Sequence, residues 1–298
     1  MFDVIAFHGP DIIDMDANNL PQRRLYHQKY VFASIESSDN YPLCSANYDG
    51  YFNWTWTYKL DSEVRWGYFV IRDSNKDIVG PRKNMNWLNW SDMADVDNVT
   101  KKILRHKTKA VAWFVSNCIT KSRREGYVMG LQKYLNQYGL QIDIYGACGG
   151  LECGRDKEEE CNKMIETDYY FYLAFENAFS EDYVTEKVLI PLQHNAIPIV
   201  YGGADYTRFL PPDSYLDARE LGVYKLGDQI YKLMQDPELY AHYFKWKNHY
   251  SYHRMSENVE TDEYCQMCAL LNNERKMTQI SVYKQFQKWW DPPSATCY

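Results

Sequence analysis

The sequence predicts an α/β fold built on a parallel, doubly wound sheet. The main observation is that apolar, strand-like runs alternate with amphipathic, helix-like segments between Lys109 and Gly203. This order places helices on both faces of a parallel sheet. A second observation is the composition, because 45% of the residues are hydrophobic and 24% are charged, as in a globular chain. The length of 298 residues fits one large domain or two of ordinary size.

Short strand-like runs precede this region. Val4–Phe7 and Tyr30–Ile35 are apolar and rich in β-branched and aromatic residues, so each predicts a strand. Trp54–Tyr58 is aromatic enough for a strand, although it could as easily begin a helix. A helical segment is expected around Asp95–His106.

In the alternating region, each predicted strand is followed by a polar loop and a helix. The strands are expected at residues 110–115, 141–145, 170–175 and 197–201. Ser122 and Glu125 have the spacing of a capping box, so a helix is expected to begin there and to run to about Tyr138. Asp182 is predicted to cap a helix over Tyr183–His194. Beyond Leu226 the chain is expected to be helical over residues 227–235, 238–250 and 263–274.

The excess of acidic side chains argues against a protein that wraps nucleic acid. The chain has 33 basic and 40 acidic residues and a formal net charge of −7, whereas nucleic-acid-binding surfaces are strongly cationic. A single phosphate group is still allowed, because it needs only a local pair of cations. Aromatic residues reach 16%, and their rings suit sugar surfaces as well as cores.

Cysteines and glycosylation sequons favour the secretory route. The chain has eight cysteines, and sequons begin at Asn53, Asn89 and Asn98. No apolar run approaches the roughly 18 residues of a membrane span, and the first residues lack the layout of a signal peptide. We therefore expect a luminal fragment whose targeting segment has been removed.

The cysteine spacings favour disulfides over metal or redox sites. Cys148, Cys153 and Cys161 could suggest zinc, but no histidine supports a tetrahedral site. Cys265 and Cys268 lie on a predicted helix without a thioredoxin-like strand before it, so we interpret them as structural. The glycines from position 146 to 150 do not form a dinucleotide-binding G-x-G-x-x-G loop.

Polar residues gather where two neighbouring strands end. After the strand at 170–175 come Glu176 and Asn177, and soon afterwards Glu186 and Lys187. Lys187 is placed to meet phosphate charge at a helix start, and Glu186 to accept hydrogen bonds from sugar or ribose hydroxyls. An exposed first turn would explain Glu186 alone, but not the density of polar groups.

The equivalent place after the strand at 110–115 carries Ser116, Asn117 and Arg124. Ligands of doubly wound sheets bind beyond the carboxyl ends of the strands. Arg124 and Lys187 are therefore expected to converge on one edge, as a diphosphate leaving group requires.

At these residues the sequence resembles a known family. The stretch FYLAFENAFSEDYVTEKVLIPLQHNAIPIVYGG is similar to the donor-site signature of the α1,3-fucosyltransferases that use GDP-fucose. The resemblance extends through AVAWFVSNC, YGAC and the late Cys-x2-Cys, and covers the chain from about residue 2 to its end. It implies a GT-B architecture, with two Rossmann-like domains facing across a cleft, and an inverting transfer. The cysteines in FVSNC and YGAC are most similar to those of invertebrate and plant members that act on the N-glycan core.

The resemblance also implies roles for particular residues. The positions that match donor-binding residues are Ser116, Asn117, Arg124, Tyr145, Asn177, Tyr183, Glu186 and Lys187. Glu36, in the segment ASIESS, matches the glutamate that supplies the catalytic base, while Asp39 and Asp49 are competing carboxylates. His8 stands alone where many relatives have a His-His-Arg cluster, so it is either an acceptor contact or an ordinary strand-end histidine. The late pair Cys265 and Cys268 is expected to be oxidised and to anchor the carboxyl-terminal helices.

These observations lead to one functional prediction with open alternatives. We expect an acceptor-side domain at 1–105, a GDP-fucose-binding domain at 106–275 and a tail at 276–298 that packs back on the body. The expected reaction moves L-fucose from GDP-β-L-fucose to the 3-hydroxyl of GlcNAc in the core or periphery of a glycoprotein glycan. No metal is expected to be required, because no Asp-x-Asp motif stands near a strand end. The expected location is the Golgi lumen, with a single-pass type II anchor outside this chain.

Two alternatives remain at this point. One is a secreted carbohydrate-binding protein on an inactive transferase scaffold, and the other is a GT-B transferase for a different nucleotide sugar. The presence of Glu36, Arg124 and Lys187 favours the fucosyltransferase over the binding protein.

Overall fold

The computed structural model describes residues 2–13, 15, 19–21, 23–293, 295 and 297, and the chain divides into two compact units. Unit 1 consists of Met1–Tyr68, Ala178–Tyr183 and Arg254–Tyr298. Unit 2 consists of Phe69–Asn177 and Val184–His253. These limits differ from the predicted boundaries at 105 and 275, because residues 69–105 pack within unit 2 and residues 254–275 within unit 1.

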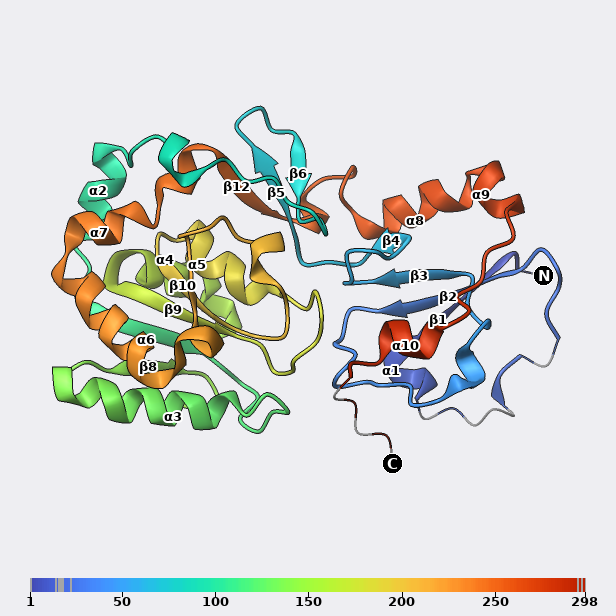
Figure 1. Ribbon diagram of the computed structural model, residues 1–298, viewed down its shortest axis with the longest axis horizontal. Coiled ribbons are helices and arrows are strands. Elements are labelled where there is room, and N and C mark those ends of the chain that lie inside the picture. The colour runs from blue at the N-terminus through green and yellow to red at the C-terminus, as the bar shows by residue number, and fades with distance from the viewer. Residues whose placement is uncertain are drawn as a thin grey trace. The chain divides into compact units, whose positions relative to one another are not determined.

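Unit 1 is built on a four-stranded parallel sheet with the order β1-β2-β3-β4 (Figure 1). The strands are β1 (Val4–His8), β2 (Lys29–Ser34), β3 (Trp54–Thr57) and β4 (Val64–Arg65). Every residue of β2 and β3 is buried, which is typical of parallel strands covered on both faces. The predicted strands are confirmed, and the segment that begins at Trp54 is a strand rather than a helix.

Helices cover both faces of this sheet. An aromatic core joins Phe32 and Phe52 to Phe286 and Trp290 of α10 (Phe286–Trp290), and the ring centroids of Phe32 and Trp290 lie 4.7 Å apart. The short α1 (Gly9–Ile12) packs against β1 and β2. A second cluster brings Met267 of α8 (Glu263–Leu271) against the tryptophans of β3, and α9 (Glu274–Thr278) follows.

Unit 2 is built on a five-stranded parallel sheet with the order β11-β10-β9-β7-β8. The strands are β7 (Lys109–Phe114), β8 (Ile142–Tyr145), β9 (Tyr169–Phe175), β10 (Ile197–Tyr201) and β11 (Leu216–Asp217). This confirms the predicted parallel, doubly wound sheet. The strand order reverses between β7 and β9, and ligands of such sheets bind at this switch point.

The helices of unit 2 pack in pairs around the sheet (Figure 1). α3 (Arg124–Leu135) contacts α6 (Ala218–Gln235), and α4 (Glu158–Asp168) contacts α5 (Leu189–Gln193). α2 (Asn98–Arg105) packs on α7 (Pro237–His242). A separate three-stranded sheet has the order β12-β5-β6, formed by β12 (Tyr250–Arg254), β5 (Phe69–Asp73) and β6 (Ile78–Gly80).

Two predicted helix starts are wrong. The capping box of Ser122 and Glu125 does not form, because α3 begins at Arg124 after a left-handed Arg123. Asp182 does not cap a helix either. Thr185 is the N-cap of a short 3₁₀ segment, Glu186–Val188, that precedes α5. In both places the polar side chains bond to neighbouring loops instead.

Six of the eight cysteines form three disulfides, as the preference for disulfides over zinc predicted. The pairs are Cys44–Cys297, Cys118–Cys148 and Cys153–Cys161. The expectation for Cys265 and Cys268 is wrong, because both are exposed and unbonded on α8. Neither thiol meets a cysteine of another element.

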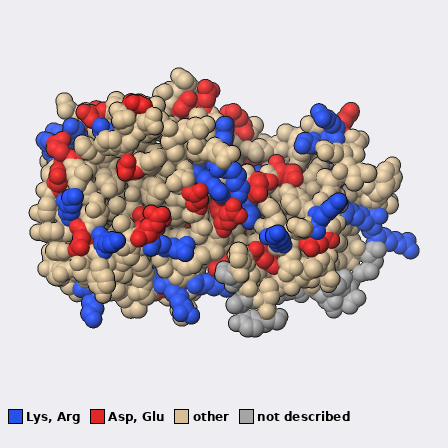
Figure 2. All heavy atoms as spheres, viewed as in Figure 1, with Lys and Arg blue, Asp and Glu red and all other residues tan. Residues whose placement is uncertain are grey.

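The sequon at Asn53 has a structural role. Its side chain is buried, its Oδ1 accepts from the backbone N–H of Tyr30 at 2.7 Å and from Arg24, and its Nδ2 donates to the carbonyl of Ser281 at 2.6 Å. The other two sequon asparagines are exposed. Among the described residues, no helix is long and apolar enough to cross a membrane. Positive and negative side chains are interspersed on the face shown in Figure 2 rather than separated by sign.

Candidate active site

The switch point of unit 2 is bordered by the loops after β7 and β9. Ser116 and Asn117 follow β7 and are exposed, and Asn177 follows β9 and is half-buried. The backbone N–H of Ser122 donates to the carbonyl of Asn177 at 3.1 Å, which ties the two loops together. The loops after the two strands therefore meet at this edge.

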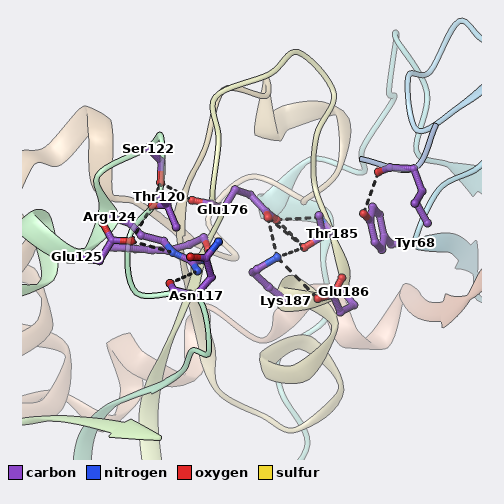
Figure 3. A network of polar contacts seen from close by, with 12 residues as sticks. Tyr68, Asn117, Thr120, Ser122, Arg124, Glu125, Glu176, Thr185, Glu186 and Lys187 are labelled. Carbon is purple, nitrogen blue, oxygen red and sulfur yellow. Dashed lines mark hydrogen bonds and ion pairs between the residues drawn. The ribbon is translucent and has the colours of Figure 1, made fainter. Parts of the chain in front are cut away.

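Glu176 is a fully buried carboxylate at the end of β9. Its Oε1 accepts from the backbone N–H and the hydroxyl of Thr185, both at 2.9 Å, and its Oε2 accepts from Lys187 at 3.0 Å. Figure 3 shows these three residues converging. A buried charge needs such compensation, because desolvation of an unpaired carboxylate costs several kcal/mol.

Lys187 is held in place on its protein side. Its ammonium also donates to the hydroxyl of Thr185 at 2.7 Å and lies 3.7 Å from the carboxylate of Glu186. Burial lowers the pKa of Lys187, but the carboxylates of Glu176 and Glu186 outweigh this effect, so the pKa is raised. Lys187 is therefore a fixed positive charge at neutral pH. Glu186 is half exposed.

Arg124 lies between the two strand ends. Its Nη1 donates to the carbonyl of Phe175, the last residue of β9, at 2.5 Å, and its Nη2 donates to the carbonyl of Asn117 at 3.1 Å. The guanidinium carbon lies 5.6 Å from the ring centroid of Trp113 in β7. Arg124 is buried, so it is a rigid cation at the switch point that also joins the two loops.

A disulfide and a glycine shape the loop after β7. Cys118 is bonded to Cys148, which follows β8. Gly146 has a φ of +96°, and a Cβ there would lie 2.7 Å from the carbonyl oxygen of Val115, so only glycine lets the two loops approach this closely. Ser122 completes the arrangement by donating to the carbonyl of Glu176 at 2.8 Å.

Asn177 has an unused acceptor. Its Oδ1 is buried and has no hydrogen-bond partner among the described residues. Buried polar atoms are normally paired, so an orphaned carbonyl oxygen in the loop after β9 indicates a position for a donor from a ligand, such as a hydroxyl.

Two further residues predicted for the donor site, Tyr145 and Tyr183, make contacts with other tyrosines. The hydroxyl of Tyr145 bonds to that of Tyr169 at 2.7 Å and to the sulfur of Met164 at 3.4 Å. Tyr183 belongs to unit 1, where its buried ring lies 5.0 Å from that of Tyr58. Their donor-binding roles stay predictions.

In unit 1, Glu36 follows the carboxyl end of β2. Ser34 donates to the carbonyl of Glu36 at 3.0 Å, which turns the chain directly after the strand. Glu36 is half-buried, and within the described part of the chain its carboxylate forms no hydrogen bond or ion pair. His8 ends β1, opposite Ala33 of β2, and its Nδ1 lies 3.0 Å from the carboxylate of Asp11. His8 and Glu36, the two candidates for acceptor chemistry, thus lie at the carboxyl ends of two adjacent parallel strands.

The competing carboxylates are already engaged. The carboxylate of Asp39 accepts from the backbone N–H of Phe179 at 3.2 Å, and that of Asp49 accepts from the N–H of Gln287 at 2.9 Å. The hydroxyl of Ser180 accepts from the N–H of Asp39 at 2.9 Å. Asp39 therefore holds the segment Ala178–Tyr183 within unit 1, which favours Glu36 as the available base.

Two family descriptions match the chain. Residues 104–289 match glycosyltransferase family 10 (fucosyltransferase), C-terminal, and residues 1–69 match fucosyltransferase, N-terminal. The first match alone covers more than half of the chain. The chain belongs to glycosyltransferase family 10.

This family 10 chain is similar to fucosyltransferases of insects and nematodes. It is 38% identical to α-(1,3)-fucosyltransferase C of Drosophila melanogaster over 292 residues, which are 97% of this chain and 65% of the relative. It is 35% identical to glycoprotein 3-α-L-fucosyltransferase A of the same species, over 81% of this chain and 43% of the relative. It is 38% identical to α-(1,3)-fucosyltransferase fut-1 of Caenorhabditis elegans, over 64% of this chain and 44% of the relative. The chain therefore spans less than two thirds of the length of these relatives.

Solved structures show the same fold at low sequence identity. A crystal structure of α1,3-fucosyltransferase with GDP matches with a TM-score of 0.51 and 15% identity, over 88% of this chain and 78% of that one. A crystal structure of α1,3-fucosyltransferase with GDP-fucose matches with a TM-score of 0.50 and 15% identity, over 87% of this chain and 78% of that one. These matches and the parallel sheets of both units confirm the predicted α/β fold class of GT-B type.

Sequence reasoning missed one residue of this family 10 site. Thr185 contributes a backbone N–H and a hydroxyl to Glu176 and accepts from Lys187. A threonine two positions before the lysine was visible in YVTEK. No local pattern shows that Thr185 bonds both to Lys187 and to Glu176, which stands nine positions earlier.

Proposed function

We propose that this chain is an α1,3-fucosyltransferase that moves L-fucose from GDP-β-L-fucose to the 3-hydroxyl of GlcNAc in a glycoprotein glycan. The observation that carries the proposal is the fixed ammonium of Lys187, held by Glu176 and Thr185 at the switch point beside Arg124. Two neighbouring cations at such an edge suit a diphosphate. The names of the relatives and the GDP and GDP-fucose of the matched structures support the choice of donor.

The donor-site residues take distinct roles in this proposal. Lys187 and Arg124 stabilise the negative charge that develops on the departing GDP. Glu186 is half exposed, and among the described residues its carboxylate pairs only with Lys187. In the proposal it accepts hydrogen bonds from the ribose hydroxyls. The buried Oδ1 of Asn177 accepts a hydroxyl from the donor.

Glu36 is the base of the proposed reaction. The 3-hydroxyl oxygen attacks the anomeric carbon of fucose while Glu36 takes the hydroxyl proton. The bond between the anomeric carbon and the phosphate oxygen breaks, and GDP leaves with the electron pair. This single displacement inverts the β linkage of the donor to an α linkage, through a transition state with oxocarbenium character.

No divalent metal is required in this proposal, and a metal is at most stimulatory. The reason is that two side-chain cations take the place that a metal ion would have beside the diphosphate. Transfer that persists in excess EDTA would support this, and its loss with the fold intact would overturn it. We place the full-length protein in the Golgi lumen as a single-pass type II membrane protein.

The decisive experiment measures GDP release and fucosylated product together. Purified protein receives GDP-fucose and a panel of N-glycans that differ at the core and at the antennae, and mass spectrometry locates the added fucose. We expect one fucose per accepting GlcNAc and an equal amount of GDP. Glycan binding without GDP release would favour an inactive carbohydrate-binding scaffold, and protection of the fold by UDP but not by GDP would favour a different donor.

A further inference from the structure

Unit 1 carries a groove of about 600 Å³ that the donor site does not use. Its walls are the loop between β3 and β4, the extended segment before α10, and α10 itself. The residues that carry the argument below are Glu63, Glu181, Tyr283, Lys284, Lys288 and Trp289. The volume falls within the range of small-molecule sites and would hold about two or three sugar rings.

Glu63 is a preorganised acceptor in this groove. Its Oε2 accepts from the backbone N–H of Thr55 at 2.8 Å, from the hydroxyl of Thr55 at 2.9 Å and from the hydroxyl of Tyr283 at 2.9 Å. The residue nevertheless remains exposed. The Tyr283 hydroxyl also reaches Oε1, at 3.1 Å. A carboxylate has about four acceptor positions and three protein donors share this one, so Glu63 can still receive one hydroxyl donor from the groove.

Trp289 contacts neighbouring residues through both its ring and its backbone carbonyl. Its ring lies 5.2 Å from that of Tyr283, with an angle of 56° between the ring planes. The ammonium of the buried Lys59 lies 5.0 Å from the Trp289 ring centroid and donates to the Trp289 carbonyl at 2.8 Å. Trp289 is half-buried and is one of the residues that line the groove. The groove therefore combines a rigid aromatic surface with a rigid carboxylate.

This combination fits an uncharged, polyhydroxylated ligand. Sugar rings place C–H groups on aromatic faces and hydroxyls on carboxylates. Two carboxylates and two ammonium groups line the groove, so it has no excess of cations for a nucleotide.

The rim of the groove includes part of the family signature. Glu181 lies in the segment Ala178–Tyr183, which packs within unit 1, and its carboxylate is 3.7 Å from the ammonium of Lys59. We propose that the groove binds the sugar residues of the acceptor glycan beyond the GlcNAc that receives fucose. This inference rests on the proposed function and names a subsite for its acceptor.

The test compares a long and a short acceptor in Glu63→Gln and Tyr283→Phe. The long acceptor is an asialo biantennary N-glycan, and the short one is a β-GlcNAc glycoside that lacks the further sugars of the glycan. We expect KM for the long acceptor to rise about tenfold or more, while the short acceptor and GDP-fucose keep their KM values. Glu274→Gln, an exposed charge removal on α9, is the matched control and should change neither acceptor.

An equal effect on both acceptors, or no effect on either, would overturn the subsite. A second measurement is independent of turnover. Saturation-transfer NMR of the same asialo glycan should show strong contacts with the wild-type protein that weaken in Glu63→Gln. If the wild type transfers no fucose but this binding difference persists, the proposed reaction is rejected and glycan binding by the groove is supported. Equal NMR contacts in both proteins would reject the groove.

Discussion

Glu176 and Lys187 show how a buried charge pair can prepare a binding site. The carboxylate of Glu176 is completely removed from water and is compensated by Thr185 and Lys187. Removing one partner of such a pair leaves the other charge uncompensated, which usually costs about 3–5 kcal/mol. The ammonium is thereby positioned before any ligand arrives, so little conformational entropy remains to be lost on binding.

Lys187→Ala should therefore weaken both the fold and donor binding. We expect GDP affinity to fall by about tenfold or more, because a charge-assisted hydrogen bond contributes on the order of 1.5–3 kcal/mol. The melting temperature should also fall, since Glu176 loses its counterion. Isothermal titration with GDP and a thermal scan measure the two effects. Lys133→Ala, an exposed lysine of α3, is the control. Unchanged GDP affinity in Lys187→Ala would reject the assignment.

Glu36 and Asp39 can be distinguished because only Asp39 is engaged by its own unit. Glu36→Gln keeps the size of the side chain and removes its basicity, so GDP-fucose binding should survive while kcat falls by about 10²-fold or more. Asp39→Asn should loosen the contact with Phe179 and have the smaller effect on kcat. Steady-state kinetics with saturating acceptor measure both variants. More than about a tenth of wild-type kcat in Glu36→Gln would place the base elsewhere.

At the scale of elements, the loop after β7 depends on a covalent link to the loop after β8. The disulfide Cys118–Cys148 closes 30 residues of chain and holds the loop that carries Ser116 and Asn117. The other short disulfide, Cys153–Cys161, joins the segment after β8 to α4 and does not include the loop after β7. Removing each disulfide in turn can therefore distinguish a loss of stability from a change in donor binding.

Replacing both Cys118 and Cys148 by Ser should lower the free energy of unfolding by about 2–4 kcal/mol. It should also raise KM for GDP-fucose, because the loop loses its restraint. The same double replacement at Cys153 and Cys161 should lower stability but leave this KM unchanged. Denaturant unfolding and donor kinetics measure the two quantities. A similar KM change in both double variants would show that the loop after β7 has no special dependence on its disulfide.

For the whole molecule, cysteine accounting tests the fold directly. Six cysteines are paired, and Cys265 and Cys268 are exposed on α8. We expect the native, unreduced protein to take up two maleimide groups per chain, at these two positions, as intact mass and peptide mapping would show. Labelling of Cys44 or Cys297 would contradict the pairing that ties the amino-terminal part of unit 1 to the end of the chain.

The apolar runs of the sequence predicted the longer strands of the two parallel sheets, which are β1, β2, β3, β7, β8, β9 and β10. They did not predict the two-residue strands β4 and β11 or the separate sheet β12-β5-β6. A buried parallel strand needs a continuous apolar run, and a polar loop must follow where the strand leaves the core, so these features are local. For the same reason Ser116, Asn117, Arg124, Asn177 and Lys187 could be assigned to one edge from spacing alone.

Only the tertiary structure decides which polar groups meet and which unit each segment joins. Glu176 and Lys187 pair because the chain folds back after β9, and Asp182 does not cap a helix because the segment Ala178–Tyr183 packs in unit 1. The hydroxyl of Tyr145 faces Tyr169 although its sequence position suits the donor site. The physical reason is that burial and hydrogen bonding depend on neighbours that are distant in sequence, and no local pattern of residues contains that information.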